Sequence, residues 1–221
     1  MKQLYIEDCL KTLKRDIEYD YIVTSPPDFN ELTGDSKTNL SYTDFLESFV
    51  KELNPKGDFA SICISDRKSG GQIISKHSMG IDVFKSLGWT LHTHKIWVKS
   101  TGINMFRLNY QHLLTFSRKK QTRPLITDFK PDVFVVNQSK WNNYSYGMPV
   151  RIIELLVNNY TDKGDTVYDP FMGSGTTAEA CVNTNREWKG SEINKKCAQM
   201  TIDRISSLDN HYFTENANIH I

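Results

Sequence analysis

The pattern of hydrophobic and polar positions predicts strands that alternate with helices along most of the chain. Short runs rich in β-branched and aromatic residues predict strands at 4–6, 19–23, 59–64, 89–98, 112–117, 166–168 and 188–191. Apolar residues at helical spacing predict helices at 10–15, 41–53, 73–87, 150–160, 176–183 and 195–205. This alternation is typical of an α/β fold with a mostly parallel sheet.

Length and composition favour one folded domain over residues 1–221. Hydrophobic residues make up 38% and charged residues 24% of the chain, which disfavours a disordered or fibrous protein. Segment 119–146 has mixed signals and is interpreted as an insertion, and 210–221 as a loose tail. The sequence lacks an apolar stretch of roughly 20 residues and an apolar signal-peptide core, so we expect an intracellular protein that does not contact a membrane.

Neither a disulfide framework nor a metal site is expected. The four cysteines, Cys9, Cys63, Cys181 and Cys197, are scattered without a Cys-x-x-Cys pair and are interpreted as reduced thiols. His92 and His94 alternate onto one strand face and could bind a metal, but a structural or phosphate-facing role is favoured.

Charge is distributed unevenly along the chain. Between residues 95 and 140 there are nine basic and two acidic residues, interleaved with aromatics, whereas residues 1–55 are net acidic. Basic residues with aromatics fit contacts to a nucleic-acid backbone and stacking on bases, and a solvated basic hairpin is the alternative. The candidate substrate-binding cations are Lys99, Arg107, Arg118, Lys119 and Lys120.

A glycine-rich turn follows the strand predicted at 166–168. Residues 169–177 read Asp-Pro-Phe-Met-Gly-Ser-Gly-Thr-Thr and lead into a predicted helix, where glycines permit close approach and free N–H groups favour an anionic group. The spacing and lysine of a phosphate loop are missing. Roughly 20 residues on, Glu192 ends the next predicted strand, where an acidic side chain can accept hydrogen bonds from ribose hydroxyls. Together they favour a nucleoside-cofactor site over a purely structural turn.

A second polar turn, Ser25-Pro26-Pro27-Asp28, follows the strand predicted at 19–23. The prolines fix the backbone and lack N–H donors, so the Pro26 carbonyl and the Ser25 hydroxyl can present two acceptors to one amino group. Such acceptors favour the pyramidal form of an exocyclic amine, which can attack a methyl donor. A plain strand-ending turn is the alternative for this motif alone.

Together the two turns resemble those of the amino-group DNA methyltransferases of the N4-cytosine/N6-adenine family, which use S-adenosylmethionine. Ser25-Pro26-Pro27 is similar to the family's catalytic turn, and residues 169–177 match its cofactor turn. Asp8-Cys9 resembles a further family element near the N-terminus, and the segments 97–99 and 112–117 resemble the family's hairpin. The catalytic turn precedes the cofactor turn, which is the circularly permuted order of the β class.

The resemblance implies a Rossmann-like, circularly permuted methyltransferase sheet with a hairpin and a short recognition insertion. It implies that Asp8 reads the cofactor adenine and that the glycine turn and Glu192 close the cofactor pocket. The cofactor-binding candidates are Asp8, Cys9, Thr24, Asp169, Phe171, Gly173, Ser174, Gly175, Thr176, Thr177 and Glu192, and the catalytic candidates are Ser25, Pro26, Pro27 and Asp28.

One departure from the family pattern concerns the base pocket. The family usually has an aromatic residue, which stacks on the flipped base, at the position of Asp28. Phe29 could take this role, Asp28 could accept a hydrogen bond from the base, or the pocket could be catalytically impaired. An active enzyme is favoured because the cofactor constellation is intact. Direct in-line methyl transfer then needs neither a covalent intermediate nor a metal.

The resemblance favours double-stranded DNA as the partner and cytosine N4 as the target, since Ser-Pro-Pro forms of the family are commonly cytosine enzymes. Adenine N6, an RNA substrate and a non-catalytic nucleic-acid binding module remain alternatives. A short insertion implies brief or relaxed specificity, or recognition shared with a second subunit of a homodimer. The cytoplasm or nucleoid of a prokaryote or a phage-infected cell is the expected location, with a role in restriction-modification, phage protection or epigenetic marking.

Overall fold

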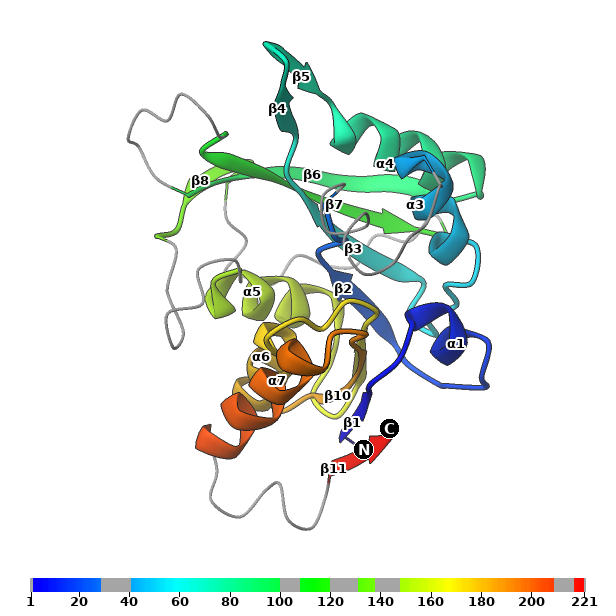
Figure 1. Cartoon of the computed structure of the whole chain (residues 1–221), viewed down its shortest axis with the longest axis vertical. Coiled ribbons are helices and arrows are strands. Elements are labelled where there is room, and N and C mark those ends of the chain that lie inside the picture. The colour runs from blue at the N-terminus through cyan, green and yellow to red at the C-terminus, as the bar shows by residue number, and fades with distance from the viewer. Residues whose placement is uncertain are drawn as a thin grey trace.

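The computed structural model describes residues 2–28, 41–99, 108–119, 131–137, 148–208 and 217–220. Within these residues, nine strands form one sheet in the order β11-β1-β10-β9-β2-β3-β7-β6-β8 (Figure 1). The strands in this order are β11 (Ala217–His220), β1 (Lys2–Tyr5), β10 (Glu187–Ser191), β9 (Thr166–Asp169), β2 (Tyr21–Thr24), β3 (Phe59–Ile64), β7 (Tyr110–Ser117), β6 (Thr90–Val98) and β8 (Val133–Val135).

All neighbouring strands are parallel except where β7 pairs with β3 and β6. The carboxyl ends of the parallel strands therefore share one side of the sheet, which we call the carboxyl edge. Because Ile64 and Ile96 both lie opposite His112, strand β6 ends at this edge too. Strands β9 and β2 come from opposite ends of the chain and lie side by side. Their following turns thus meet at the carboxyl edge, as at the switch point of a doubly wound sheet.

Helices cover both faces of the sheet. One face packs against α1 (Cys9–Leu13), α3 (Tyr42–Val50) and α4 (Lys76–Ser86), and the other against α5 (Val150–Tyr160), α6 (Thr176–Asn183) and α7 (Lys195–Leu208). Helix α3 begins with a capping box in which Ser41 and Asp44 each accept a hydrogen bond from the other's backbone N–H. The predicted α/β fold with a mostly parallel sheet is therefore confirmed. No helix within the described residues is long and apolar enough to cross a membrane.

The segment after β3 differs from its prediction. A hairpin of β4 (Arg67–Ser69) and β5 (Gln72–Ile74) replaces the polar loop and the first turn of the helix expected at 73–87. Gly70 and Gly71 both have positive φ, 57° and 77°, which suits a two-residue hairpin turn. The hairpin projects away from the sheet at the top of Figure 1.

The tail differs as well. Residues 217–220, expected to be loose, form β11 and pair in parallel with β1. The pairing satisfies the backbone groups that β1 would otherwise expose at the edge of the sheet. Most of the expected insertion, residues 120–130 and 138–146, lies outside the described residues, and its short β8 extends the sheet beside β6.

Candidate functional site

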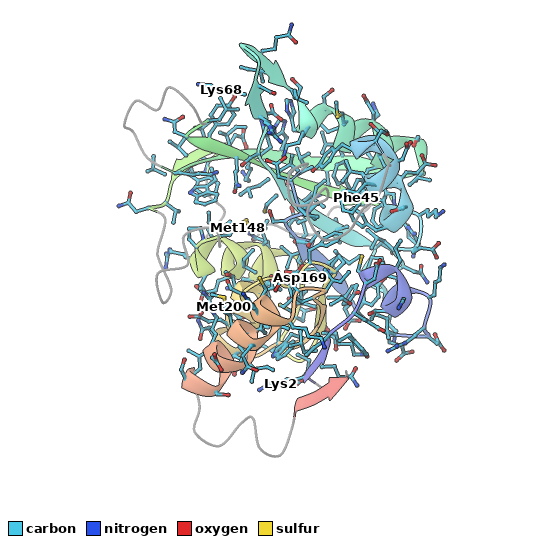
Figure 2. The ribbon with its side chains drawn as sticks, in the orientation of Figure 1. Lys2, Phe45, Lys68, Met148, Asp169 and Met200 are labelled. Carbon is cyan, nitrogen blue, oxygen red and sulfur yellow. The ribbon has the colours of Figure 1, made fainter. Side chains whose placement is uncertain are left out.

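Asp169 ends β9 and holds the turn that follows it. Its Oδ1 accepts hydrogen bonds from Thr24 Oγ1 at 2.5 Å and from the Phe171 N–H at 3.0 Å. Its Oδ2 accepts from Thr177 Oγ1 at 2.6 Å. The side chain is buried, and desolvation raises the pKa of its carboxyl, an effect that the three donors oppose. Asp169, labelled in Figure 2, thus joins the predicted cofactor turn to the strand that carries the predicted catalytic turn.

The glycine turn has the shape that the sequence predicts. Gly173 and Gly175 have φ of 57° and 84°, and a Cβ added to Gly175 would lie 2.9 Å from the Cα of Thr201 on α7. The Gly173 N–H donates to Glu192 Oε2 at 2.8 Å, and Thr201 Oγ1 donates to the Gly173 carbonyl at 2.9 Å. Glycine is therefore required at position 175 both by φ and by the close approach of α7.

The other predicted cofactor residues gather around this turn. Asp8 follows β1 and caps α1, where its Oδ1 accepts from the Leu10 N–H at 2.9 Å. The Glu192 N–H donates to the Tyr5 carbonyl at 3.0 Å, which brings the end of β10 beside that of β1. Phe171 packs against Phe49, with ring centroids 5.1 Å apart. The buried members of the set are Cys9, Thr24, Ser174, Thr176 and Thr177.

Burial and local pairing make several of these residues supports of the pocket. Thr24 is 1% exposed and its hydroxyl proton is donated to Asp169. Burial is the main cause that raises the pKa of the Cys9 thiol, which keeps it protonated. Thr176 Oγ1 accepts from Arg204 NH1 at 2.9 Å. The groups with geometry suited to a cofactor are thus the glycine backbone and the carboxylates of Asp8 and Glu192.

The predicted catalytic turn lies at the same edge, directly beside the cofactor turn. Ser25 Oγ donates to the Cys63 carbonyl at 3.1 Å, so its lone pairs remain available as acceptors. Pro26 and Pro27 follow at once and supply no backbone donors. The turn therefore presents acceptors without competing N–H groups, as an amine substrate requires.

Asp28, the residue at the family's aromatic position, forms ion pairs with two cations. Its Oδ1 lies 3.0 Å from Lys76 Nζ and 3.9 Å from Arg67 NH1. The Lys76 side chain is only 4% exposed, and its Nζ lies 5.3 Å from the ring centroid of Tyr42. Lys76 and Arg67 were not predicted from the sequence. They lie at the two ends of the segment 67–76, which follows β3 at the carboxyl edge, and this position is the signal that could have identified them.

The predicted substrate-binding cations that the structure describes lie at opposite ends of the strands. Lys99 follows β6 at the carboxyl edge, where its Nζ donates to Ser65 Oγ at 3.2 Å. Arg118 follows β7 at the other side, where its NH1 donates to Asn54 Oδ1 at 2.8 Å. Lys119 pairs there with Asp58 at 2.7 Å. The structure brings Lys99 to the predicted site but not Arg118 or Lys119, because β7 runs antiparallel to β3. Phe29, Arg107 and Lys120 lie outside the described residues.

The geometry gives the carboxyl edge two adjoining parts. The cofactor side consists of the glycine turn, Asp8, Asp169 and Glu192, and the base side consists of Ser25, Asp28, Arg67 and Lys76. The Thr24–Asp169 hydrogen bond joins them. An anionic or ribose group on one side and an amine on the other would therefore be held next to each other.

Comparison with known proteins supports the family resemblance of the two turns. A family model described as DNA methylase, for enzymes that act on N6 or N4, matches residues 19–203. Type II methyltransferase M.BglII of Bacillus subtilis is 22% identical over 86% of this chain, which spans 64% of that relative. TTHA0409 of Thermus thermophilus, described as a putative DNA modification methylase and solved with S-adenosyl-L-methionine, is 20% identical with a TM-score of 0.77, and the match covers 100% of both chains. PvuII DNA methyltransferase, described as cytosine-N4-specific, covers 99% of this chain and 95% of its own at 17% identity, with a TM-score of 0.77.

Proposed function

The chain belongs to the N6/N4 DNA methylase family, and we propose that it transfers a methyl group from S-adenosylmethionine to the exocyclic amino group of a DNA base. Cytosine N4 is the favoured target. The observation that carries the proposal is the Thr24–Asp169 hydrogen bond, because it fixes the amine-binding turn against the cofactor turn. Acceptors and cofactor groups that are far apart in the sequence thereby face one reaction site.

The residues on the cofactor side fit S-adenosylmethionine. When bound, this cofactor supplies a methyl group on a positively charged sulfur, together with its own leaving group. The glycines leave room for a cofactor because they have no Cβ atoms, and Glu192, which accepts from the Gly173 N–H, presents a carboxylate suited to ribose hydroxyls. Asp8 at the end of β1 can accept a hydrogen bond from the adenine amino group.

The residues on the base side orient the nucleophile. Ser25 Oγ, which donates its proton to the Cys63 carbonyl, and the Pro26 carbonyl accept the two N–H bonds of the target amine. Held in this way, the target amine would direct its lone pair toward the cofactor side, where S-adenosylmethionine, held by the glycine turn, Asp8 and Glu192, would supply the methyl group. The amine passes its extra proton to water. The protein supplies position and electrostatics rather than a covalent intermediate.

DNA contacts are expected at the carboxyl edge. Arg67 and Lys68 lie on the projecting hairpin, where Lys68 is labelled in Figure 2, and Lys99 follows β6 at the same edge. A duplex approaching this edge would meet these cations next to the base side, where a flipped base must enter. Arg118 and Lys119 at the opposite side would not reach it.

The choice of cytosine N4 rests on Ser25 and is supported by the likeness to the PvuII enzyme. Ser-Pro-Pro forms of the family are commonly cytosine enzymes. Adenine N6 is the alternative target, because a serine hydroxyl and a carbonyl would serve as acceptors for either amine. Asp28 cannot stack on a base as an aromatic ring would. Its ion pair with Lys76 instead supports a polar wall that hydrogen-bonds the edge of the flipped base.

The test is transfer of an isotopically labelled methyl group from S-adenosylmethionine to mixed-sequence DNA and to RNA of matched sequence. Digestion to nucleosides and mass spectrometry should find N4-methylcytosine in DNA. The label should be lost with Ser25→Ala and kept with Ser86→Ala, whose hydroxyl bonds within α4. Labelled N6-methyladenine would overturn the base assignment, label confined to RNA would overturn the DNA assignment, and cofactor binding without transfer would favour a binding module.

A further inference from the structure

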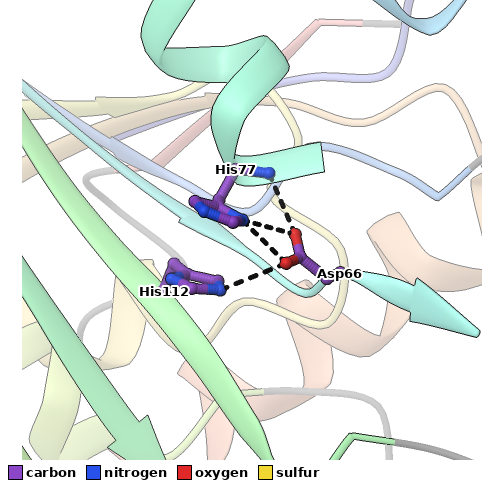
Figure 3. Close-up of side chains that lie close together, drawn as sticks. All are labelled: Asp66, His77 and His112. Atoms are coloured by element: carbon purple, nitrogen blue, oxygen red, sulfur yellow. Dashed lines mark hydrogen bonds and ion pairs between the residues drawn. The ribbon is translucent and has the colours of Figure 1, made fainter. Parts of the chain in front are cut away.

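A second polar cluster lies at the carboxyl edge, beside the base side. Asp66 follows β3, His77 lies in the first turn of α4, and His112 lies on β7 (Figure 3). His77 Nδ1 lies 2.7 and 2.8 Å from the two carboxylate oxygens of Asp66, and the His77 backbone N–H donates to Oδ1 at 3.0 Å. One carboxylate oxygen and one nitrogen of each ring all lie within 4.8 Å of one another.

The cluster contains a buried nitrogen without a hydrogen bond. His112 is 6% exposed, and its Nε2 faces Asp66 Oδ2 at 3.4 Å, too far for a good hydrogen bond. Its other nitrogen, Nδ1, lies 2.9 Å from His94 Nε2.

The unpaired nitrogen of His112 makes a cation the natural complement of this arrangement. When His112 Nδ1 donates its proton to His94, the Nε2 lone pair points at a carboxylate that is only 3% exposed. A lone pair that faces a carboxylate is unfavourable, and a positive ion between them would satisfy both. The hydrogen bond to His94 would then fix the tautomer and ring orientation of His112, as outer partners of metal-bound histidines do.

We propose that Asp66, His77 and His112 bind a divalent transition-metal ion of the zinc class. Two imidazole nitrogens and one carboxylate oxygen are a common zinc ligand set, and they leave one position for water. Imidazole ligands disfavour Mg²⁺ and Ca²⁺, which prefer oxygen. The rings of His77 and His112 stack with centroids 3.9 Å apart, so binding requires the His77 ring to turn. Its side chain is 25% exposed and borders solvent.

An ion here would tie together three segments around the base side. His77 is next to Lys76, which forms the ion pair with Asp28, and Asp66 is next to Arg67, which also approaches Asp28. Metal binding would therefore fix both partners of Asp28. This consequence rests on the proposed function, whereas metal binding itself does not.

The test is titration of the full chain with Co²⁺, a zinc substitute whose visible absorption reports its ligands. After treatment with a chelator and removal of any histidine tag, one equivalent of Co²⁺ should give a saturable visible band that one equivalent of Zn²⁺ abolishes. His77→Gln, His112→Gln and Asp66→Asn should each weaken binding at least tenfold. His92→Gln is the matched control, because His92 packs against Phe59 away from the cluster and should leave the band unchanged.

Two results would overturn the proposal: a wild-type protein without a saturable band, or ligand variants that bind Co²⁺ as tightly as the wild type. Circular dichroism and binding of S-adenosylmethionine identify variants that have failed to fold. His112 is buried, so if its variant unfolds, the partly exposed His77 decides the outcome. A wild-type protein that binds Co²⁺ but does not methylate DNA would count against the proposed function alone.

Discussion

The two sides of the carboxyl edge are held together by different forces. On the cofactor side, buried Asp169 accepts hydrogen bonds from two hydroxyls and a backbone N–H. On the base side, Asp28 has a side chain that is 40% exposed and relies on ion pairs with Lys76 and Arg67. Buried hydrogen bonds to a charged group are short and costly to break, whereas the ion pairs of a partly exposed carboxylate are weakened by water and salt. Substitutions on the cofactor side should therefore mainly lower the free energy of unfolding, whereas substitutions on the base side should mainly lower activity.

The largest effect is expected at Gly175. Gly175→Ala forces an alanine to φ 84° and sets its Cβ 2.9 Å from the Cα of Thr201. We expect a loss of about 3 kcal/mol in the free energy of unfolding and of more than tenfold in affinity for S-adenosylmethionine. Urea unfolding and calorimetric titration measure the two quantities.

Gly88→Ala is the control for this substitution. Gly88 has nearly the same φ, 83°, but nothing lies within 4 Å of an added Cβ. It should lose about 1 kcal/mol and leave cofactor affinity unchanged. Equal effects of the two substitutions would mean that close packing against α7 does not shape the cofactor side.

The next effect is a dependence of stability on pH that arises beside the base side. The pKa of His112 is about 4 in the folded chain and about 6.5 when exposed. Between these values the unfolded chain binds a proton that the native chain does not, so stability is highest above pH 6.5 and falls as the pH drops toward 4. We expect a loss of about 3 kcal/mol over this window in metal-free protein.

Urea unfolding at several pH values measures this loss. His112→Gln has no titrating ring and should flatten the profile, whatever its stability at neutral pH. His92→Gln removes a histidine whose pKa burial also lowers, but which lies outside the cluster. If the free energy of unfolding still falls as steeply with decreasing pH in His112→Gln, the acid sensitivity of stability arises at another group, and the distinction between the two sides is weakened.

The same contrast explains how far the sequence predicts the site. The cofactor side can be predicted from the sequence because residues 169–177 are contiguous. Their glycines adopt positive φ, and Asp169 accepts a hydrogen bond from the N–H of nearby Phe171, so local backbone geometry accounts for these residue types. The alternation of strands and helices predicts the α/β class, and the permuted motifs predict that the two turns share one site. The base side depends on contacts between segments that no spacing reveals, such as Asp28 with Lys76 and His77 with Asp66. Sequence position alone groups Arg118 and Lys119 with Lys99, and the antiparallel pairing of β6 and β7 separates them.

A smaller effect is expected from Lys76→Met, which keeps most of the side-chain volume and removes the charge. Asp28 then loses its nearest partner, so the wall of the base pocket is less well positioned. We expect turnover on DNA to fall about tenfold, while stability changes by about 1 kcal/mol at most, since replacing a buried cation by an apolar group is often nearly neutral. Lys85→Met, at the exposed end of α4, should change neither quantity. Unchanged turnover in Lys76→Met would remove Asp28 and Lys76 from the base side.

The smallest effect is expected from Lys119→Ala, although the sequence places this residue in a basic stretch. Lys119 pairs with Asp58 at the opposite side of the sheet, and its side chain is 65% exposed, so its loss should change stability by less than about 0.5 kcal/mol. The DNA affinity of the Lys119→Ala variant and the salt dependence of that affinity should equal those of the wild type.

Lys99→Ala, at the carboxyl edge, should instead weaken binding across sequences and reduce the salt slope by about 1, the contribution of one phosphate contact. Fluorescence anisotropy at several salt concentrations separates the two variants. The reverse result would move the DNA to the side of Lys119, where a flipped base could not reach Ser25, and would therefore contradict the arrangement of the whole carboxyl edge.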